Sequence, residues 1–471
     1  MVALVSKSSR AIFALCSLVT AQRGFADASA DIGACLKKAG IEHSVPTTST
    51  WVIDTQAWNS RVSPNPSAVV FPTTEKQVSA ALKCAASSGA KVTTLGGNRS
   101  FSSMGFGRND GALVINLKYM SHLKYDESTK LLSFGGNVTI SEAAKYLLKY
   151  KRTTPHGRCA DVGMTGVSAS GFGTLSRAYG TALDNLVFAR VAIANGSIVD
   201  ASLRQNSDLF WAVRGAASSM GVVLDFKTKT YSFPSVSVTN YTIAFRKDAK
   251  PTIQDNVDAL IGTQNWALSN DNNDFLSIRL SLKIKSLMEG FFYGSSIDAK
   301  KVLGSLMKRL PTSMVLTTTE NSFWASENIS TPTLFTNTAF APKLPDASAS
   351  GFVDIWGGKF TRGVRADDTA WKHDDNLLLI RWDMRSSAFD VPFAKSSITT
   401  MRKNFYKFVD AYKASGGVPG GFPTYRDELW TVAEMAKYLY GPNFPRLQKI
   451  KTKYDPYERF NADAQSIPAL H

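Results

Sequence analysis

The sequence predicts an α+β fold: a first region of alternating strands and helices, a middle region of strands, and a helical tail. From Ala68 to about Pro234, short apolar runs alternate with helical patterns. From Val236 to about Val391, the runs TNYTIAF, FLSIRLSLKI and LLLIRWDM alternate apolar and polar residues, as in a sheet that packs on one face. From Pro392 onward the apolar periodicity is helical.

Local signals predict the elements of the first region. The segments AVVFP, KVTTL, ALVINL and LLSFGG predict strands, and Thr74–Gln77 predicts the start of a helix after the first of them. Ser141 predicts the N-cap of a second helix, because its hydroxyl can accept a backbone hydrogen bond. The buried face of the helix after Thr74 is expected to hold Val78, Ala81, Leu82 and Ala85.

A hairpin and three more helices complete the predicted elements. ARVAIANGSIVDAS predicts two strands joined at Asn195-Gly196, a strong hairpin signal. Ser207 and Asp208 predict the cap of the helix LFWAVRGA. In the tail, AKSSITTMRKNFYKFVDAYKAS predicts a long helix that stops at Gly416-Gly417, and a last helix is expected to end before Tyr454-Asp455-Pro456.

Length and charge narrow the class of protein. A chain of 471 residues is too long for one hydrophobic core, so two or three lobes are expected. The net charge is +16, but the basic clusters at Lys145–Arg152 and Lys449–Lys453 follow helical periodicity and do not alternate with aromatic residues. This pattern favours a solvated basic surface and argues against nucleic acid as a partner.

The first residues predict export from the cell. Lys7 and Arg10 precede the apolar run AIFALCSLVTA, which is followed by small residues around Ala21 and Ala30. This is the layout of a secretory signal, assigned to residues 1–21, and the run is too short to span a bilayer. Secretion would make the sequons at Asn137, Asn195, Asn240 and Asn328 glycosylation sites.

The four cysteines agree with an oxidising compartment. Cys16 would leave with the signal, so that three remain, and an odd number means one pair and one leftover thiol. Cys35 and Cys84 lie on short helical patterns and are candidate partners. Cys159 would then be the thiol that needs another explanation.

Two glycine-rich loops, GGNRSFSSMGFG and GRCADVGMTGVSASGFG, follow strands and lie about 60 residues apart. Backbone amide groups without bulky side chains can bind a pyrophosphate. Neither loop has the spacing of a dinucleotide-binding or phosphate-binding helix start. From the residues alone, a pyrophosphate site and two structural turns are equal alternatives.

Several blocks in order resemble one family. SRVSPNPSAVVFPTTEKQVSAALKCA, PHGRCADVG, SRAYGTALDNLV and NSDLFWAVRGAASSMGVV are similar to berberine-bridge-enzyme-like oxidases of the vanillyl-alcohol-oxidase superfamily, in their fungal form. YGPNFPRLQKIKTKYDPYERF resembles the C-terminal signature of the same family. The resemblance runs from about Ala34 to the terminus and is weakest in the middle.

The resemblance implies an architecture. It predicts a two-lobed PCMH-type FAD-binding domain at residues 62–233 and a substrate domain with an antiparallel sheet at 234–415. Residues 416–471 would form a berberine-bridge-like segment that returns to the flavin domain. It also implies a disulfide between Cys35 and Cys84.

FAD is the cofactor that the resemblance implies, with no metal. Cys159 matches the cysteine that many members bond to the flavin ring at its 6 position. Val162 matches a small gate residue, and valine there goes with access of oxygen. The expected cofactor-binding residues are Gly96, Gly97, Asn98, Arg99, Ser100, Cys159, Val162, Gly163, Gly166, Gly173 and Asn443.

Arg99 departs from the family pattern, in which a histidine bonds to the flavin 8-methyl carbon. A guanidinium is permanently protonated and has no free lone pair for that bond. FAD would therefore be attached through Cys159 alone or held by contacts alone. Arg99 either brings positive charge to the pyrophosphate or the reduced flavin, or marks the decay of a spare gene. The turn SASGFG also has one glycine fewer than the family pattern.

Tyr425 is the candidate catalytic base. In sugar and alcohol oxidases of the family, a tyrosine in an Asn-Tyr-x-Asp stretch takes the substrate proton, and FPTYRDEL resembles this stretch with Thr424 in place of asparagine. A tyrosine with an ordinary pKa of about 10 needs a nearby cation to act as a base. Arg426 and Arg381 are the candidates.

Together these signals predict a secreted, monomeric FAD-dependent oxidase that uses oxygen on a small organic molecule in fungal secondary metabolism, with no membrane partner. A carbohydrate oxidase is the alternative in the same class. A flavin-free binding homologue is the alternative from another class. Aromatic residues of the middle region that can stack on substrate or fill the core are Trp266, Phe292, Trp324 and Trp356.

Overall fold

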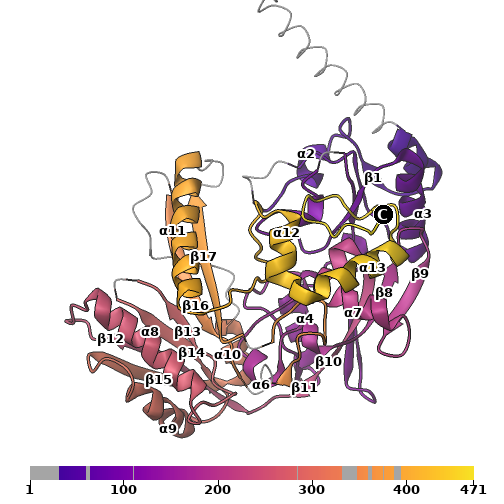
Figure 1. The fold of residues 1–471 in the computed structure, drawn as a ribbon. Helices are drawn as coiled ribbons and strands as arrows, with labels where there is room; N and C mark the ends of the chain where they lie inside the picture. The colour runs from indigo at the N-terminus through magenta and orange to yellow at the C-terminus, as the bar shows by residue number, and fades with distance from the viewer. Residues whose placement is uncertain are drawn as a thin grey trace, which may run out of the picture.

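The computed structural model describes residues 31–59, 64–109, 111–283, 285–330, 347–358, 363–374, 376–386 and 394–471. The proposed signal at residues 1–21 lies outside this part. Figure 1 shows a first region, made mainly of indigo and magenta elements, beside a second region that carries its own sheet and helices. No helix among the described residues combines the length and apolar composition that crossing a membrane requires.

The first sheet is small and buried. Its order is β1-β2-β4-β3, in which β4 is parallel to both β2 and β3. Helix α3 (Glu75–Ser88) crosses between the parallel strands and buries Val78, Ala81, Leu82 and Ala85, as predicted. The strands are β1 (His43–Ser44), β2 (Ala68–Val70), β3 (Val92–Leu95) and β4 (Leu113–Asn116).

The second sheet is antiparallel, in the order β5-β6-β10-β8-β9. Its apolar face packs under α4 (Ile140–Leu148) and α7 (Ser207–Ala216), whose backbone leaves helical geometry at Arg214 and Gly215. The predicted hairpin is present, because β8 pairs with β9 and Gly196 has a φ of 83° in the turn. The strands are β5 (His122–Asp126), β6 (Leu131–Gly135), β8 (Leu186–Ala192), β9 (Ile198–Ser202) and β10 (Val222–Lys229).

Short elements connect these sheets. The pair β7 (Arg152–Thr153) and β11 (Tyr231–Ser232) forms a separate ribbon. The described segments also contain a helix over residues 31–38, α2 (Trp51–Asp54), α5 (Met164–Val167) and α6 (Ser176–Tyr179). Short 3-10 turns lie at Met104–Phe106, Lys118–Met120, Leu183–Asn185 and Ala217–Ser219.

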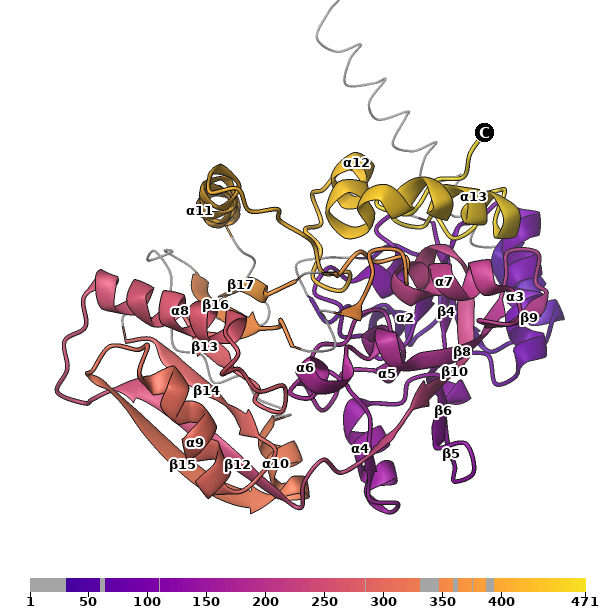
Figure 2. The same cartoon turned by 60° about the horizontal axis from the view of Figure 1, so that its bottom comes forward.

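The third sheet belongs to the middle region and is wholly antiparallel, in the order β15-β12-β14-β13-β16-β17. Helices α8 (Ile253–Leu268) and α9 (Ser296–Met307) cover one face of it (Figure 2). Helix α10 (Phe323–Ser330) follows β15. The strands are β12 (Ser237–Phe245), β13 (Arg279–Ser281), β14 (Leu287–Phe292), β15 (Met314–Ser322), β16 (Ala347–Ile355) and β17 (Leu378–Ser386).

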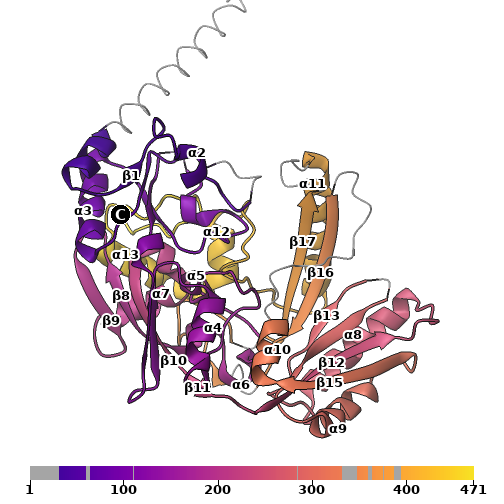
Figure 3. The same ribbon diagram turned by 180° about the vertical axis from the view of Figure 1, so that it is seen from behind.

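The C-terminal part first leaves and then rejoins the first region. Helix α11 (Lys395–Ala414) runs beside β17, where Phe405 makes an edge contact with Trp382 (Figure 3). The chain then crosses back through α12 (Val432–Met435), a π-helical turn (Ala436–Tyr440), a 3-10 turn (Gly441–Asn443) and α13 (Phe444–Tyr454), which packs against α7. The predicted α+β fold, with an antiparallel substrate-domain sheet and a returning C-terminal segment, is confirmed.

Two predicted helix caps are wrong by a small shift. Helix α4 is capped by Thr139 in place of Ser141, because the hydroxyl of Thr139 and the carboxylate of Glu142 form a reciprocal capping box. Helix α7 has Asn206, in a left-handed conformation, in the cap position in place of Ser207 and Asp208. The cap at Thr74 is confirmed, since its hydroxyl accepts from the backbone of Gln77.

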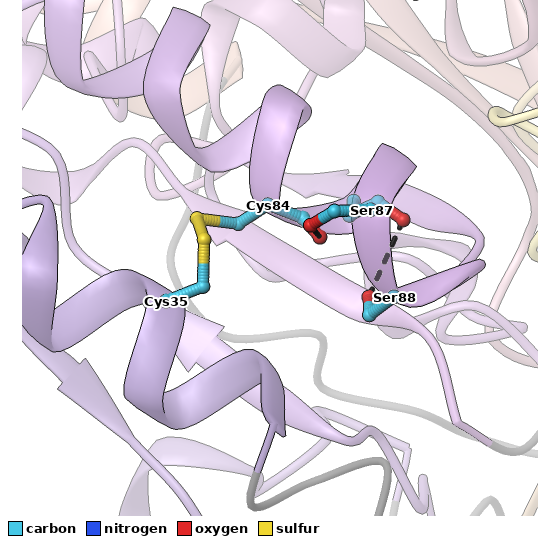
Figure 4. The surroundings of a disulfide bond; sticks show 5 residues. Cys35, Cys84, Ser87 and Ser88 are labelled. Atoms are coloured by element: carbon cyan, nitrogen blue, oxygen red, sulfur yellow. Dashed lines mark hydrogen bonds between the residues drawn. A yellow bond between two sulfur atoms is a disulfide. The ribbon is translucent and has the colours of Figure 1, made fainter.

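A disulfide joins Cys35, in the helix over residues 31–38, to Cys84 in α3 (Figure 4). The bridge closes a separation of 49 residues and ties the start of the described chain to the first sheet. Disulfides persist in oxidising compartments, so this bond is consistent with the secretory pathway.

Candidate functional site

The two glycine loops meet through their backbones. A Cβ atom placed on Gly97 would lie 2.6 Å from the backbone nitrogen of Gly163, and one on Gly163 would lie 2.9 Å from the Cα of Gly97. A Cβ on Gly96 would lie 2.6 Å from the hydroxyl of Thr165. Real Cβ atoms are essentially never so close to other atoms, so a side chain at Gly97 or Gly163 would require the backbone to shift, and one at Gly96 would require Thr165 to shift.

The amide groups of both loops are available to a ligand. Among the hydrogen bonds of the described residues, none is donated by the backbone N–H groups of residues 97–102 or 157–161. Clustered amide donors of this kind bind phosphate groups. A Cβ on Gly166 would face open space, so the backbone is also bare on that side. These features fit the pyrophosphate and ring of a dinucleotide such as FAD.

Cys159 is a half-buried thiol in the second loop. Burial raises its pKa, with a smaller contribution in the same direction from Asp161, while the guanidinium groups of Arg381, Arg279 and Arg99 act against it. Arg158 and His156 are the basic residues nearest to Cys159 in the sequence, yet the pKa of the thiol is raised. Both side chains are engaged elsewhere.

Arg158 and Arg279 share one buried carboxylate, Asp354 in β16. Arg279 donates to it through two nitrogens, at 2.7 and 2.6 Å, and Arg158 donates at 3.2 Å. Burial acts to raise the pKa of Asp354, but the guanidinium groups outweigh burial and hold the pKa below its usual value. Burial and the neighbouring Arg279 lower the pKa of Arg158 to about 10. This cluster joins the Cys159 loop to the third sheet.

His156 makes a second buried link to the middle region. Its Nε2 lies 3.0 Å from a carboxylate oxygen of Glu327 in α10, and its Nδ1 lies 2.7 Å from the carbonyl of Gly157. Burial disfavours the protonated ring, but Glu327 outweighs it and raises the pKa of His156 above its ordinary value.

We expect this link to weaken at high pH. A raised histidine pKa stabilises the fold fully below the unfolded value of about 6.5, and the stabilisation is lost as the pH rises through the folded pKa. The difference in unfolding temperature between wild type and His156→Gln should therefore be larger at about pH 6 than at about pH 9. Thermal unfolding at both pH values checks this, and an equal difference would contradict it.

Arg99 in the first glycine loop forms an ion pair with the second loop. Its Nη2 donates to the carboxylate of Asp161 in the second loop. Its guanidinium carbon lies 5.9 Å from the ring centre of Trp58. The charge of Arg99 is therefore already paired within the protein.

Tyr425, in the C-terminal segment, lies between the first glycine loop and strand β17 of the third sheet. Arg381 in β17 donates to its hydroxyl at 3.2 Å, and the guanidinium carbon of Arg381 lies 5.1 Å from the Tyr425 ring centre. Phe101 of the first glycine loop contacts the same ring at 5.4 Å between centres. Next to Tyr425, the hydroxyl of Thr424 lies 3.1 Å from that of Ser170, in the turn with one glycine fewer. Of the two candidate cations, Arg381 donates to the tyrosine hydroxyl, whereas Arg426 donates to the carbonyl of Pro423.

The remaining predicted residues occupy different places. Asn98 has a φ of 48° and donates to the carbonyl of Gln56, whereas Ser100 accepts from the backbone of Met104. Val162 packs against the core of the second sheet. A Cβ on Gly173 would lie 2.0 Å from the carbonyl oxygen of His156, so Gly173 packs directly against the backbone at the start of the second glycine loop.

The side chain of Asn443 is held by the segment between β16 and β17. Its amide nitrogen donates to three carbonyls, at 2.6, 3.2 and 3.3 Å, and these belong to residues 366–370.

Three of the four aromatic residues considered for stacking, Trp266, Phe292 and Trp356, are buried in core clusters. They fill cores and do not line an open surface.

Sequence reasoning missed Asp161, Arg279 and Asp354. Each pairs with a residue far along the chain, so no local spacing pointed to the partner. One signal was present: Asp354 interrupts the otherwise apolar run FVDIW, and a lone charge in a buried strand requires a partner.

The comparisons with known proteins support an FAD-dependent enzyme. Residues 66–202 match the family described as an FAD binding domain, and residues 425–468 match the family described as berberine and berberine like. Glucooligosaccharide oxidase from Sarocladium strictum is 29% identical over 91% of this chain and 93% of its own length.

Two solved structures have the same fold. Glucooligosaccharide oxidase from Acremonium strictum, with a 6-S-cysteinyl, 8α-N1-histidyl FAD, has a TM-score of 0.82 and 26% identity over 93% of this chain and 99% of that one. Xylooligosaccharide oxidase from Myceliophthora thermophila, in complex with xylobiose, has a TM-score of 0.81 and 26% identity over 94% of this chain and 100% of that one. The FAD-binding and the berberine-like family models thus both match this chain, and over most of its length it is similar to fungal oligosaccharide oxidases.

Proposed function

We propose that this protein is a secreted FAD-linked carbohydrate oxidase. The observation that carries the proposal is the Tyr425 hydroxyl, which Arg381 holds at 3.2 Å beside the two glycine loops. Several relatives are named as oxidases of oligosaccharides, and another as a carbohydrate oxidase. This favours the carbohydrate alternative over the expected secondary metabolite.

The glycine loops and Cys159 would hold the cofactor. The amide groups of residues 97–102 suit the pyrophosphate, and Cys159 lies in the second loop, which touches the first at Gly163. We keep the boundaries 62–233, 234–415 and 416–471 for the flavin, substrate and C-terminal parts. Bound FAD would accept the two electrons that leave the oxidised carbon of the substrate.

Tyr425 would take the proton from the substrate hydroxyl as the carbon is oxidised. Arg381 donates a hydrogen bond to the phenolic oxygen and its guanidinium lies over the ring, so the hydroxyl is held in one position beside a permanent positive charge. With a side chain 39% exposed, Tyr425 is open to an incoming substrate. The residue has the position, the access and the charged neighbour that the role needs.

Tyr425 is part of a row of aromatic rings. Trp58, Phe101, Tyr425 and Phe422 follow one another with ring centres 5.2, 5.4 and 5.0 Å apart. Trp58 is 38% exposed, so the outer end of this row faces solvent. Rings of this kind provide the apolar faces on which small ligands pack in binding sites.

The function is tested by a visible spectrum and a peroxide assay on the purified protein. We expect a flavin spectrum, and peroxide released with oligosaccharides of glucose, xylose or N-acetylglucosamine. A flavin spectrum without oxidation of any sugar would return the proposal to a non-carbohydrate substrate. A folded protein without flavin would overturn the oxidase reading in favour of a binding homologue.

The attachment of the flavin gives a separate prediction. Because Arg99 cannot form the histidyl bond, wild-type protein precipitated with acid should keep its flavin through Cys159 alone. Cys159→Ala and Cys159→Ser should release it into the supernatant, which is measured by absorbance of both fractions. Release of all the flavin from the wild-type protein would show that contacts alone hold it.

A further inference from the structure

Arg99 and Asp161 form an ion pair across the two glycine loops. Their side chains are 34% and 39% exposed, so neither is part of a core. Asp161 lies two residues after Cys159, and Arg99 lies two residues after Gly97, the point of backbone contact. The pair therefore joins the loops beside the thiol.

The surroundings orient the arginine toward its partner. The Trp58 ring lies 5.9 Å from the guanidinium carbon, and Trp58 makes an edge contact with Phe101, two residues after Arg99. At the neighbouring contact, Gly97 and Gly163 have no side chains to interlock. The ion pair thus links the two loops through charged side chains, next to the point where Gly97 and Gly163 touch through their backbones.

The two charges act on Cys159 in opposite directions. Arg99 lowers the pKa of the thiol and Asp161 raises it. Removing both charges together leaves the local net charge unchanged, because one is positive and the other negative. The effect of the link on position can therefore be separated from the effect of charge.

We propose that Arg99 and Asp161 form a clasp between the two glycine loops and act as positioning residues for the Cys159 sulfur. This rests on the proposed attachment of FAD at Cys159. Where Arg99 excludes a histidyl bond, the clasp keeps the loop that carries the remaining anchor in place.

Four proteins test the clasp: wild type, Arg99→Met, the neutral double variant Arg99→Met/Asp161→Asn, and the swapped variant Arg99→Asp/Asp161→Arg. The measurement is the ratio of acid-stable to acid-released flavin in protein collected at short intervals after induction. The double variant should attach flavin about twofold to fivefold more slowly, the range that a pair of this exposure contributes. The swapped variant should recover toward wild type.

The control is an ion pair of similar exposure far from the loops. Arg309 and Asp271 pair at 2.7 Å with side chains 31% and 49% exposed. Arg309→Met/Asp271→Asn should leave the attachment rate unchanged. A neutral double variant that equals wild type would overturn the clasp in favour of local charge, and so would a swapped variant no better than the neutral one.

Failure of the attachment itself is recognised separately. If all wild-type flavin is acid-released, Cys159 is a free thiol, and its rate of alkylation by iodoacetamide is measured in the same proteins. The clasp then predicts an about twofold to fivefold change in the double variant, with recovery in the swapped variant. Equal alkylation rates in all four proteins would overturn it.

Discussion

Tyr425→Phe is expected to lower kcat on the best sugar by about 10²–10⁴-fold, the usual contribution of a positioned general base. The ring and its contacts with Phe101 and Phe422 stay, because only the hydroxyl is removed. Substrate binding should change little, so KM is expected to stay close to wild type. Steady-state peroxide release over a range of sugar concentrations separates the two parameters.

Two further variants make this test specific. Tyr457→Phe removes a hydroxyl from a side chain that is 77% exposed and should have wild-type kinetics. Arg381→Met removes the cation that donates to the Tyr425 hydroxyl, so it is also expected to lower kcat. Full activity in Tyr425→Phe would show that another group takes the proton.

Lys451→Met is expected to destabilise the protein by about 3–5 kcal/mol, the cost of breaking a buried ion pair. Lys451 and Asp455 are both 0% exposed and lie 2.6 Å apart in and after α13. The ammonium group also donates to the carbonyl of Ser219 at 2.7 Å. Burial lowers the pKa of Lys451 despite the partner carboxylate, so a charged group is energetically costly at this site. Without Lys451, the charge of the buried Asp455 carboxylate would have no cation beside it, and its burial would cost more.

The matched control lies two residues along the same helix. Lys453 pairs with Asp208, but its side chain is 58% exposed, so Lys453→Met should cost less than about 1 kcal/mol. The double variant Lys451→Met/Asp455→Asn should recover much of the loss, since asparagine carries no charge and can still accept from the backbone of Phe460. Urea unfolding measures all three, and a small loss in Lys451→Met would contradict the prediction.

Periodic and local signals made much of the fold predictable. The helix after Thr74 and the hairpin at Asn195-Gly196 depend on residues within a few positions of one another, and both are as expected. The cap of α4 is Thr139 and not the expected Ser141, because the reciprocal hydrogen bonds between Thr139 and Glu142 stabilise an earlier start of the helix. In FLSIRLSLKI only Arg279–Ser281 form the strand β13, because pairing with β14 and β16 sets its length.

The candidate site was predictable only in part. Glycine spacing and resemblance pointed to Gly97, Gly163 and Cys159, and the structure brings the two loops into contact. The choice of Arg381 over Arg426 needed the position of β17 relative to Tyr425. Asp161 could not be anticipated as a partner of Arg99, since 62 residues separate the two and an exposed carboxylate carries no signal of its own.

The buried link between Lys451 and Ser219, 232 residues apart, has a consequence for biosynthesis. The core of the second sheet includes Leu132 and Phe134 together with Leu447 and Ile450, so the strands made first are covered by a helix made late. Domains usually fold as they emerge from the ribosome, at about 5–20 residues per second. Here the cofactor lobe must wait for the whole middle region to be translated, and stable capture of the flavin is expected only after the segment containing α13 has emerged.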